Sequence, residues 1–228
     1  MRIKYDDMLK EFERVLLKKG FSQEDAYKSA KLYTENGLDG VYSHGVNRFP
    51  RTIEQIDKGY IDVKAKPILL DSHGSLERWD GQMGMGNLNA QLSMDRAIEL
   101  AKESGIGLVA LKNTNHWMRG GAYGWQAADG GCIGMCWTNT TANMPPWGGK
   151  DARIGNNPFI ISIPRGNKRH VVLDMAMSQF SYGKIEEYKF ADRELPVPGG
   201  YDKDGKLTTI PKDIEETGTT LEANAYLK

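Results

Sequence analysis

The chain has 228 residues, a length that suits one large domain or two small ones. Hydrophobic residues make up 39% and charged residues 26%, as in an ordinary globular protein, and 30 basic residues balance 30 acidic ones. This balance argues against nucleic acid as a partner, because a nucleic-acid-binding surface needs a basic excess. No apolar run approaches the roughly 18 residues of a membrane helix, and the first residues lack the apolar core of a signal peptide. We therefore expect no membrane partner and a cytoplasmic location.

The N-terminal quarter of the chain is predicted to be helical. Apolar residues at helical spacing predict helices over 5–19, 22–36 and 51–58. Ser22 and Asp25 give the second helix a capping-box start, in which a side chain satisfies a free main-chain N–H. We expect residues 1–60 to form an N-terminal helical segment.

Residues 61–228 are predicted to form a mixed α/β domain, because strand and helix patterns alternate along them. Strands are expected near 67–70 and 76–80 and at 106–111, 132–138, 159–164 and 170–175, with helices at 87–101, 121–129 and 179–193. The last four strands are expected to share one sheet. The tail from Leu195 is rich in Pro, Gly and polar residues, and 202–205 carries a turn signal.

Conventional nucleotide-binding and metal-binding motifs are missing from the sequence. The stretch that begins Gly84-Met85-Gly86 comes nearest to GxGxxG but lacks the third Gly, and no phosphate loop is present. Neither a CxxC pair nor a His-rich cluster indicates a metal site. Motifs alone therefore predict no nucleotide cofactor and no metal.

Two segments carry the residues best suited to catalysis. The first is Tyr42-Ser43-His44-Gly45-Val46-Asn47-Arg48, and the second, Asn115-His116-Trp117-Met118-Arg119-Gly120-Gly121, follows an apolar strand. Imidazole exchanges protons near neutral pH, and Arg48 and Arg51 can hold an anionic substrate through paired hydrogen bonds. A histidine at a helix start or strand end is also commonly structural. The sequence does not decide whether His44 or His116 would protonate a substrate.

These two segments, together with 105–111 and Met144-Pro145-Pro146-Trp147-Gly148-Gly149, resemble the type-2 malate/L-lactate dehydrogenase family. Several motifs in the same order carry the resemblance along the whole chain. It implies a non-Rossmann, mixed-sheet α/β fold and the reduction of a small 2-oxo acid by NADH or NADPH. It also implies a homodimer.

The resemblance assigns roles to individual residues. It implies His44 and His116 as catalytic residues and Ser43 and Arg48 as substrate-binding residues. It implies cofactor contacts at Thr140, His170, Val171, Val172, Leu173, Asp174, Met175, Ala176 and Lys228. The side chain of His170 is itself interpreted as structural.

The family pattern continues beyond the last residue of this chain. We therefore expect a C-terminally truncated chain in which the fold and the cofactor-binding domain over 61–228 are incomplete. One alternative is a dehydrogenase of malate, lactate or ureidoglycolate, and another is an inactive truncated homologue. A metal-dependent hydrolase would need clustered His and carboxylate ligands, which the sequence lacks.

Overall fold

The computed structural model describes residues 2–149, 151–166 and 169–221 of the chain. Its internal contacts divide the chain into two compact units. The first unit comprises Met1–Gly134 and Ser162–Val171, and the second comprises Met135–Ile161 and Val172–Lys228. The boundary expected near residue 60 falls inside the first unit.

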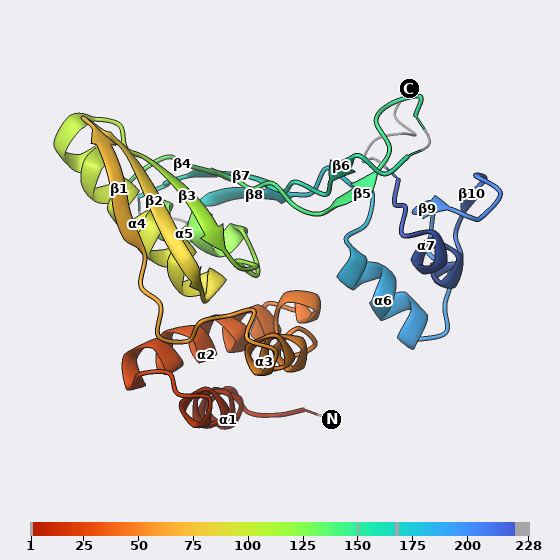
Figure 1. Ribbon diagram of the computed structural model, residues 1–228, viewed down its shortest axis with the longest axis horizontal. Helices are drawn as coiled ribbons and strands as arrows, with labels where there is room; N and C mark the ends of the chain where they lie inside the picture. The colour runs from red at the N-terminus through yellow and green to blue at the C-terminus, as the bar shows by residue number, and fades with distance from the viewer. Residues whose placement is uncertain (1, 150, 167–168, 222–228) are drawn as a thin grey trace. The chain divides into compact units, whose positions relative to one another are not determined.

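The first unit begins with three α-helices, as predicted. They are α1 (Tyr5–Lys18), α2 (Gln23–Leu38) and α3 (Phe49–Asp57), with a short 3-10 helix η1 (Tyr42–His44) before α3 (Figure 1). The Ser22 side chain accepts a hydrogen bond from the Asp25 N–H, so the predicted cap is confirmed. The rings of Phe12 and Phe49 stack with centroids 4.1 Å apart, and Tyr33 meets Phe49 edge to face. This aromatic core joins the three helices.

A mixed sheet with a crossover helix completes most of the first unit. It contains β1 (Ile68–His73), β2 (Leu76–Gly84) and β3 (Leu108–Thr114), with β1–β2 antiparallel and β2–β3 parallel. The helix α4 (Gly86–Ser104) connects β2 to β3 and packs on the sheet, and α5 (Gly121–Asp129) follows (Figure 1). Gly105 ends α4 in the left-handed conformation that favours glycine. The predicted mixed α/β fold is confirmed.

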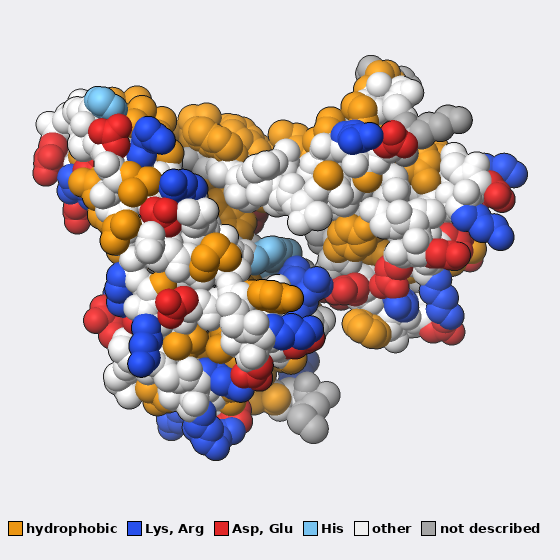
Figure 2. Space-filling view, viewed as in Figure 1, with side chains coloured by type: hydrophobic (Ala, Val, Ile, Leu, Met, Phe, Trp, Pro, Cys, Tyr) orange, Lys and Arg blue, Asp and Glu red, His pale blue; other side chains and the backbone are white. Residues whose placement is uncertain are grey.

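A second sheet is formed in the order β4 (Gly134–Trp137), β7 (Phe159–Ile163) and β8 (Val171–Met175). The expectation that 106–111 belongs to this sheet is wrong. The local crossover from β2 through α4 pairs β3 with β2 instead. On β4 and β8, alternate apolar side chains are exposed: Met135, Trp137, Val171 and Leu173. Figure 2 shows one face of the molecule, on which exposed hydrophobic side chains are coloured orange.

The rest of the second unit is built from short elements. The strands β5 (Ala142–Met144) and β6 (Ile154–Gly155) pair, as do β9 (Gly200–Tyr201) and β10 (Leu207–Thr208). The helices α6 (Tyr182–Phe190) and α7 (Pro211–Thr217) share a small core of Ile185, Leu195 and Ile214. The tail is therefore more regular than its composition predicts, because buried apolar side chains hold it. Its predicted turn is present, where Asp202 accepts two main-chain N–H bonds.

Candidate active site

The fold brings the two predicted catalytic histidines together in the first unit. His44 lies in η1 and His116 lies just after β3. Their ring centroids are 5.6 Å apart, with the ring planes inclined by 35°. Two motifs that are distant in the sequence thus form one imidazole pair.

The main chain of His44 is held against α2. The buried Asn36 side chain donates a hydrogen bond to the His44 carbonyl at 2.9 Å. A Cβ at Gly45 would lie 2.8 Å from the Gly37 nitrogen, so only glycine allows this approach. The Ser43 hydroxyl lies 2.9 Å from His44 Nδ1, and a hydroxyl can either donate or accept there.

His116 has a different partner at the same ring position. The Met118 N–H donates to His116 Nδ1 at 2.9 Å. A main-chain N–H can only donate, so Nδ1 carries a lone pair and the proton of the neutral ring is on Nε2. Met118 adopts a left-handed φ of 68° and buries its side chain in the core. The Tyr123 hydroxyl also donates to the Trp117 carbonyl, at 2.5 Å.

Positive charge surrounds His116. Loss of water around the ring lowers the pKa of the His116 imidazole, and the charges of Arg48, His44 and Arg51 lower it further. By its accessible surface the His116 residue is nevertheless exposed. Arg48 occupies the N-cap position of α3, and Arg51 lies in the first turn of that helix. A neutral imidazole donor beside two guanidinium groups suits an anionic ligand with a carbonyl oxygen.

Thr140 and residues 172–176, predicted to bind cofactor, belong to the second unit. The Thr140 hydroxyl donates to Asn157 Oδ1 at 3.1 Å and accepts from the Asn157 N–H at 3.2 Å. Asp174 is exposed on β8, where its charge adds to burial in raising the pKa of the Cys136 thiol. Because β8 is the edge strand of its described sheet, one side of its main chain is not paired within that sheet.

His170 and Val171 belong to the first unit, and the His170 ring is held on both sides. His170 Nδ1 accepts the Arg165 N–H at 3.1 Å, and Nε2 lies 3.0 Å from the Asp129 carboxylate. The Trp125 ring lies 5.8 Å away, between centroids. These contacts give His170 a structural position. Lys228 lies outside the described residues.

Asn36 is a supporting residue that the sequence reasoning missed. Its side chain is 1% exposed near the end of α2. Asparagine is a poor residue for a helix interior, because its side chain competes for main-chain hydrogen bonds. That mismatch was the only signal in the sequence.

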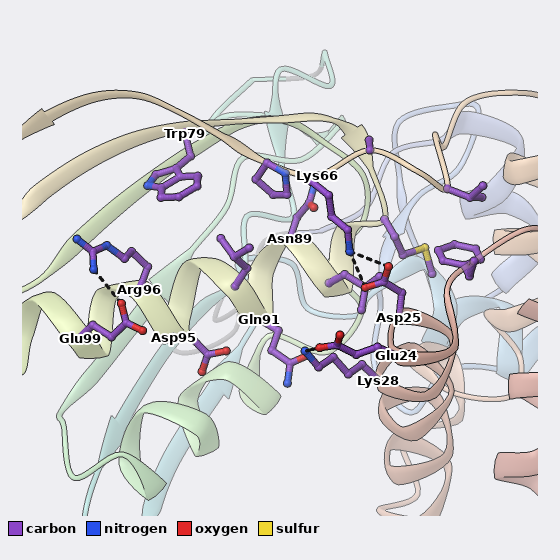
Figure 3. Close-up of a pocket in the computed structure, with 17 residues that line it drawn as sticks. Glu24, Asp25, Lys28, Lys66, Trp79, Asn89, Gln91, Asp95, Arg96 and Glu99 are labelled. Atoms are coloured by element: carbon purple, nitrogen blue, oxygen red, sulfur yellow. Dashed lines mark hydrogen bonds and ion pairs between the residues drawn. The ribbon is translucent and has the colours of Figure 1, made fainter. Parts of the chain in front are cut away.

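A separate open pocket of about 380 Å³ lies between α2 and the β2–α4 region (Figure 3). No predicted site residue lines it. Most of its charged side chains form ion pairs with one another or with close neighbours: Lys66 with Asp25, Lys28 with Glu24, and Arg96 with Glu99 and Glu77. Asp95 instead accepts a hydrogen bond from the Gln126 amide. This pairing leaves little net charge for a ligand. In the described ranges, no three His, Cys, Asp or Glu residues are placed to hold a metal, and no helix has the length and apolar character to cross a membrane.

Comparison with known sequences identifies close relatives. A family profile described as malate/L-lactate dehydrogenase matches residues 3–226. The 2,3-diketo-L-gulonate reductases of Citrobacter koseri and Klebsiella pneumoniae are each 53% identical to this chain over 221 residues. The match covers 97% of this chain and 66% of each relative, so the chain spans just under two thirds of their length.

The fold of this chain also resembles the folds of solved structures. Malate dehydrogenase from Entamoeba histolytica matches with a TM-score of 0.93 at 30% identity, over 97% of this chain and 63% of that one. Sulfolactate dehydrogenase from Methanocaldococcus jannaschii matches with a TM-score of 0.87 at 35% identity, over 97% and 64% of the two chains. The similarity therefore extends over nearly all of this chain.

Proposed function

Because this chain belongs to the malate/L-lactate dehydrogenase family, we propose that it acts in the reduction of a small 2-oxo acid by NADH or NADPH. The first candidate reaction converts 2,3-diketo-L-gulonate to 3-dehydro-L-gulonate, since the similar curated relatives carry the name of that reductase. The proposal includes a homodimer, as the family resemblance implies, and a cytoplasmic location, as the sequence analysis predicts.

The proposal assigns proton donation to His44. Reduction of a carbonyl leaves an oxygen that must take a proton. A histidine that donates this proton must first exist as the protonated imidazolium. The Ser43 hydroxyl can accept from a protonated His44 Nδ1 and donate to a neutral one. The Met118 N–H can only donate to His116 Nδ1, so it opposes a proton there. This difference between the two Nδ1 partners is the observation that carries the assignment.

His116 then acts as a neutral hydrogen-bond donor. With its proton on Nε2, it can bind the substrate oxygen before and during reduction. Arg48 would anchor the substrate carboxylate, because guanidinium matches a carboxylate with two parallel hydrogen bonds. The positive charge of Arg48 also favours the neutral state of His116. The two residues thus support each other.

The nicotinamide cofactor would supply hydride to the carbonyl carbon. Candidate residues to hold it are Thr140, His170, the strand residues 171–176 and Lys228. β8 is the edge strand of its sheet among the described residues, and this position and its exposed side chains suit contact with a ligand. Both His170 ring nitrogens have protein partners, as do the Thr140 hydroxyl and the Thr140 N–H, so the main chain of His170 is the better candidate for contact.

The second candidate is an enzyme that reduces the 2-oxo acids corresponding to malate or lactate. It is favoured by the fold similarity to a malate dehydrogenase and a sulfolactate dehydrogenase. An inactive homologue is a third possibility that the same experiment addresses. Oxidation of NADH and of NADPH should be followed with 2,3-diketo-L-gulonate, oxaloacetate and pyruvate, with His44→Asn as the control. Turnover that His44→Asn leaves unchanged would contradict the proposed site.

A further inference from the structure

The end of β2 has an unusual main-chain conformation. Gln82 and Met83, both non-glycine residues, adopt left-handed φ values of 52° and 58°. Such conformations are strained for non-glycine residues and persist where the surrounding structure enforces them. The Asp80 carboxylate accepts the Gln82 N–H at 2.9 Å and supports the turn. The pairing of β2 with β3 shifts register between Asp80 and Gly84.

The turn at Gln82 and Met83 directs main-chain carbonyl groups toward the side chain of Asn115. Asn115 Nδ2 donates to the carbonyls of Tyr60, Met83 and Gly84, at 3.1, 2.9 and 3.1 Å. An amide NH2 has two hydrogens, so the three acceptors share them. The Asn115 side chain therefore ties the start of the His116 segment to two other parts of the first unit.

The main chain of the same segment rests directly on α4. A Cβ built at Gly86 would lie 2.2 Å from the Asn115 oxygen and 2.3 Å from the His116 oxygen. No real Cβ tolerates such distances, so glycine at position 86 permits the contact. Further along, Met118 anchors the segment in the core and presents its N–H to the His116 ring.

We propose that Asn115 is a positioning residue for His116, and that its amide keeps the segment in the place where the Met118 N–H meets Nδ1. Gly86 provides the surface against which the amide holds the main chain. The proposal rests on the proposed function for its catalytic meaning, but the positioning itself is a property of the folded chain.

The charged groups around His116 do not supply this orientation. Arg48 and Arg51 approach from α3 and His44 from η1, and all three favour a neutral ring without choosing a nitrogen. Arg119, in the same segment, pairs with Asp39 at the end of α2. A neutral ring freed from the Met118 N–H could place its proton on either nitrogen. The hydrogen bonds of the Asn115 amide keep the Met118 N–H at Nδ1, and the proton of the neutral ring is thereby confined to Nε2.

The test is nitrogen NMR of the imidazole rings in the 228-residue chain labelled with 15N-histidine. Substitution His116→Gln assigns the His116 signals among the four histidines. The wild type should hold the Nε2–H form and resist protonation well below the ordinary pKa of 6.5. Asn115→Ala should give a mixture of both tautomers and a titration midpoint moved toward 6.5.

Gln126→Ala is the matched control. Gln126 lies in α5, after the His116 segment, and its amide donates to the Gln91 carbonyl and to Asp95 rather than to the three carbonyls. The substitution therefore removes an amide that joins two elements of the first unit but leaves the contacts of Asn115 intact. This variant should leave the His116 signals as in the wild type. The same change in both variants would overturn the proposal, because general loosening would then explain it.

Two further outcomes would also overturn the proposal. One is a wild-type His116 that carries its proton on Nδ1, and the other is a folded Asn115→Ala chain with unchanged His116 tautomer and titration. If Asn115→Ala does not fold, Asn115→Leu keeps the approximate size of the side chain without its donor and without adding a charge, and it should give the same tautomer mixture. The NMR readout requires no turnover, so a failure of the proposed reaction would be seen separately in the activity assay.

Discussion

The His116 and His170 regions both place a histidine beside a strand and give it the same internal arrangement. In each, ring Nδ1 accepts a main-chain N–H, from Met118 for His116 and from Arg165 for His170. The opposite ring nitrogen differs. His170 Nε2 lies 3.0 Å from the Asp129 carboxylate, whereas no partner for His116 Nε2 is found among the residues that the structure describes.

This difference separates a structural histidine from a candidate catalytic one. A main-chain N–H selects the tautomer in both regions, so tautomer selection alone does not indicate function. The carboxylate uses the remaining donor of His170, while the corresponding donor of His116 has no partner among the described residues. His116 also stands beside His44, whose hydroxyl partner accommodates a change of charge.

The largest expected effect comes from removing the proposed proton donor. His44→Asn should reduce turnover of the 2-oxo acid by roughly a hundredfold or more, the usual contribution of a general acid. The steady-state rate of nicotinamide oxidation measures it. His73→Asn is the matched control and should retain turnover, because His73 is an exposed histidine that pairs with Asp71 and has no proposed role. Equal losses in the two variants would contradict the assignment of His44.

A smaller effect is expected at the substrate anchor. Arg48→Lys should raise the KM for the oxo acid about tenfold, since lysine cannot form the paired hydrogen bonds of guanidinium, with a lesser change in kcat. Arg165→Lys is the control, because Arg165 meets His170 through its main chain. A full kinetic series on both variants checks this. A change in kcat alone would argue against anchoring.

The structural role of His170 predicts that substitution of His170 lowers the free energy of unfolding more than substitution of His116 does. His170→Asn should lower the free energy of unfolding by about 1 kcal/mol, because it loses the Asp129 contact and packing on Trp125. His116→Asn should lower it less, since Nε2 has no partner to lose in the described structure. Urea denaturation compares the two. A greater loss from His116→Asn would contradict the assignment.

The smallest effect concerns pH. The pKa of His116 is lowered in the folded chain from the ordinary 6.5, so the unfolded chain takes up a proton first as pH falls. The contribution of His116 to the free energy of unfolding is fully present above about pH 6.5, and it is lost as the pH falls toward the pKa of His116 in the folded chain. Thermal unfolding between pH 6.5 and 4.5 should therefore show a declining Tm in the wild type and a flatter profile in His116→Gln. Identical profiles would show that His116 titrates normally.

Local patterns in the sequence determined several elements and the candidate site. The helix predicted at 121–129 is Gly121–Asp129, and the Ser22 cap opens α2 as its spacing indicates. Periodicity and caps act within a few residues, so a sequence shows them directly. The two histidine motifs were also visible, because His, Arg and Gly rarely cluster without a reason in chemistry or main-chain geometry.

Only the tertiary structure decided how these pieces combine. It paired β3 with β2 rather than with the second sheet, and it gave the tail a helix, α7, held by the buried Ile214. It also distinguished the two site histidines, since the tautomer of His116 depends on where the Met118 N–H lies. That position results from contacts between segments far apart in sequence, at Asn115 and Gly86, whose partners no local pattern encodes.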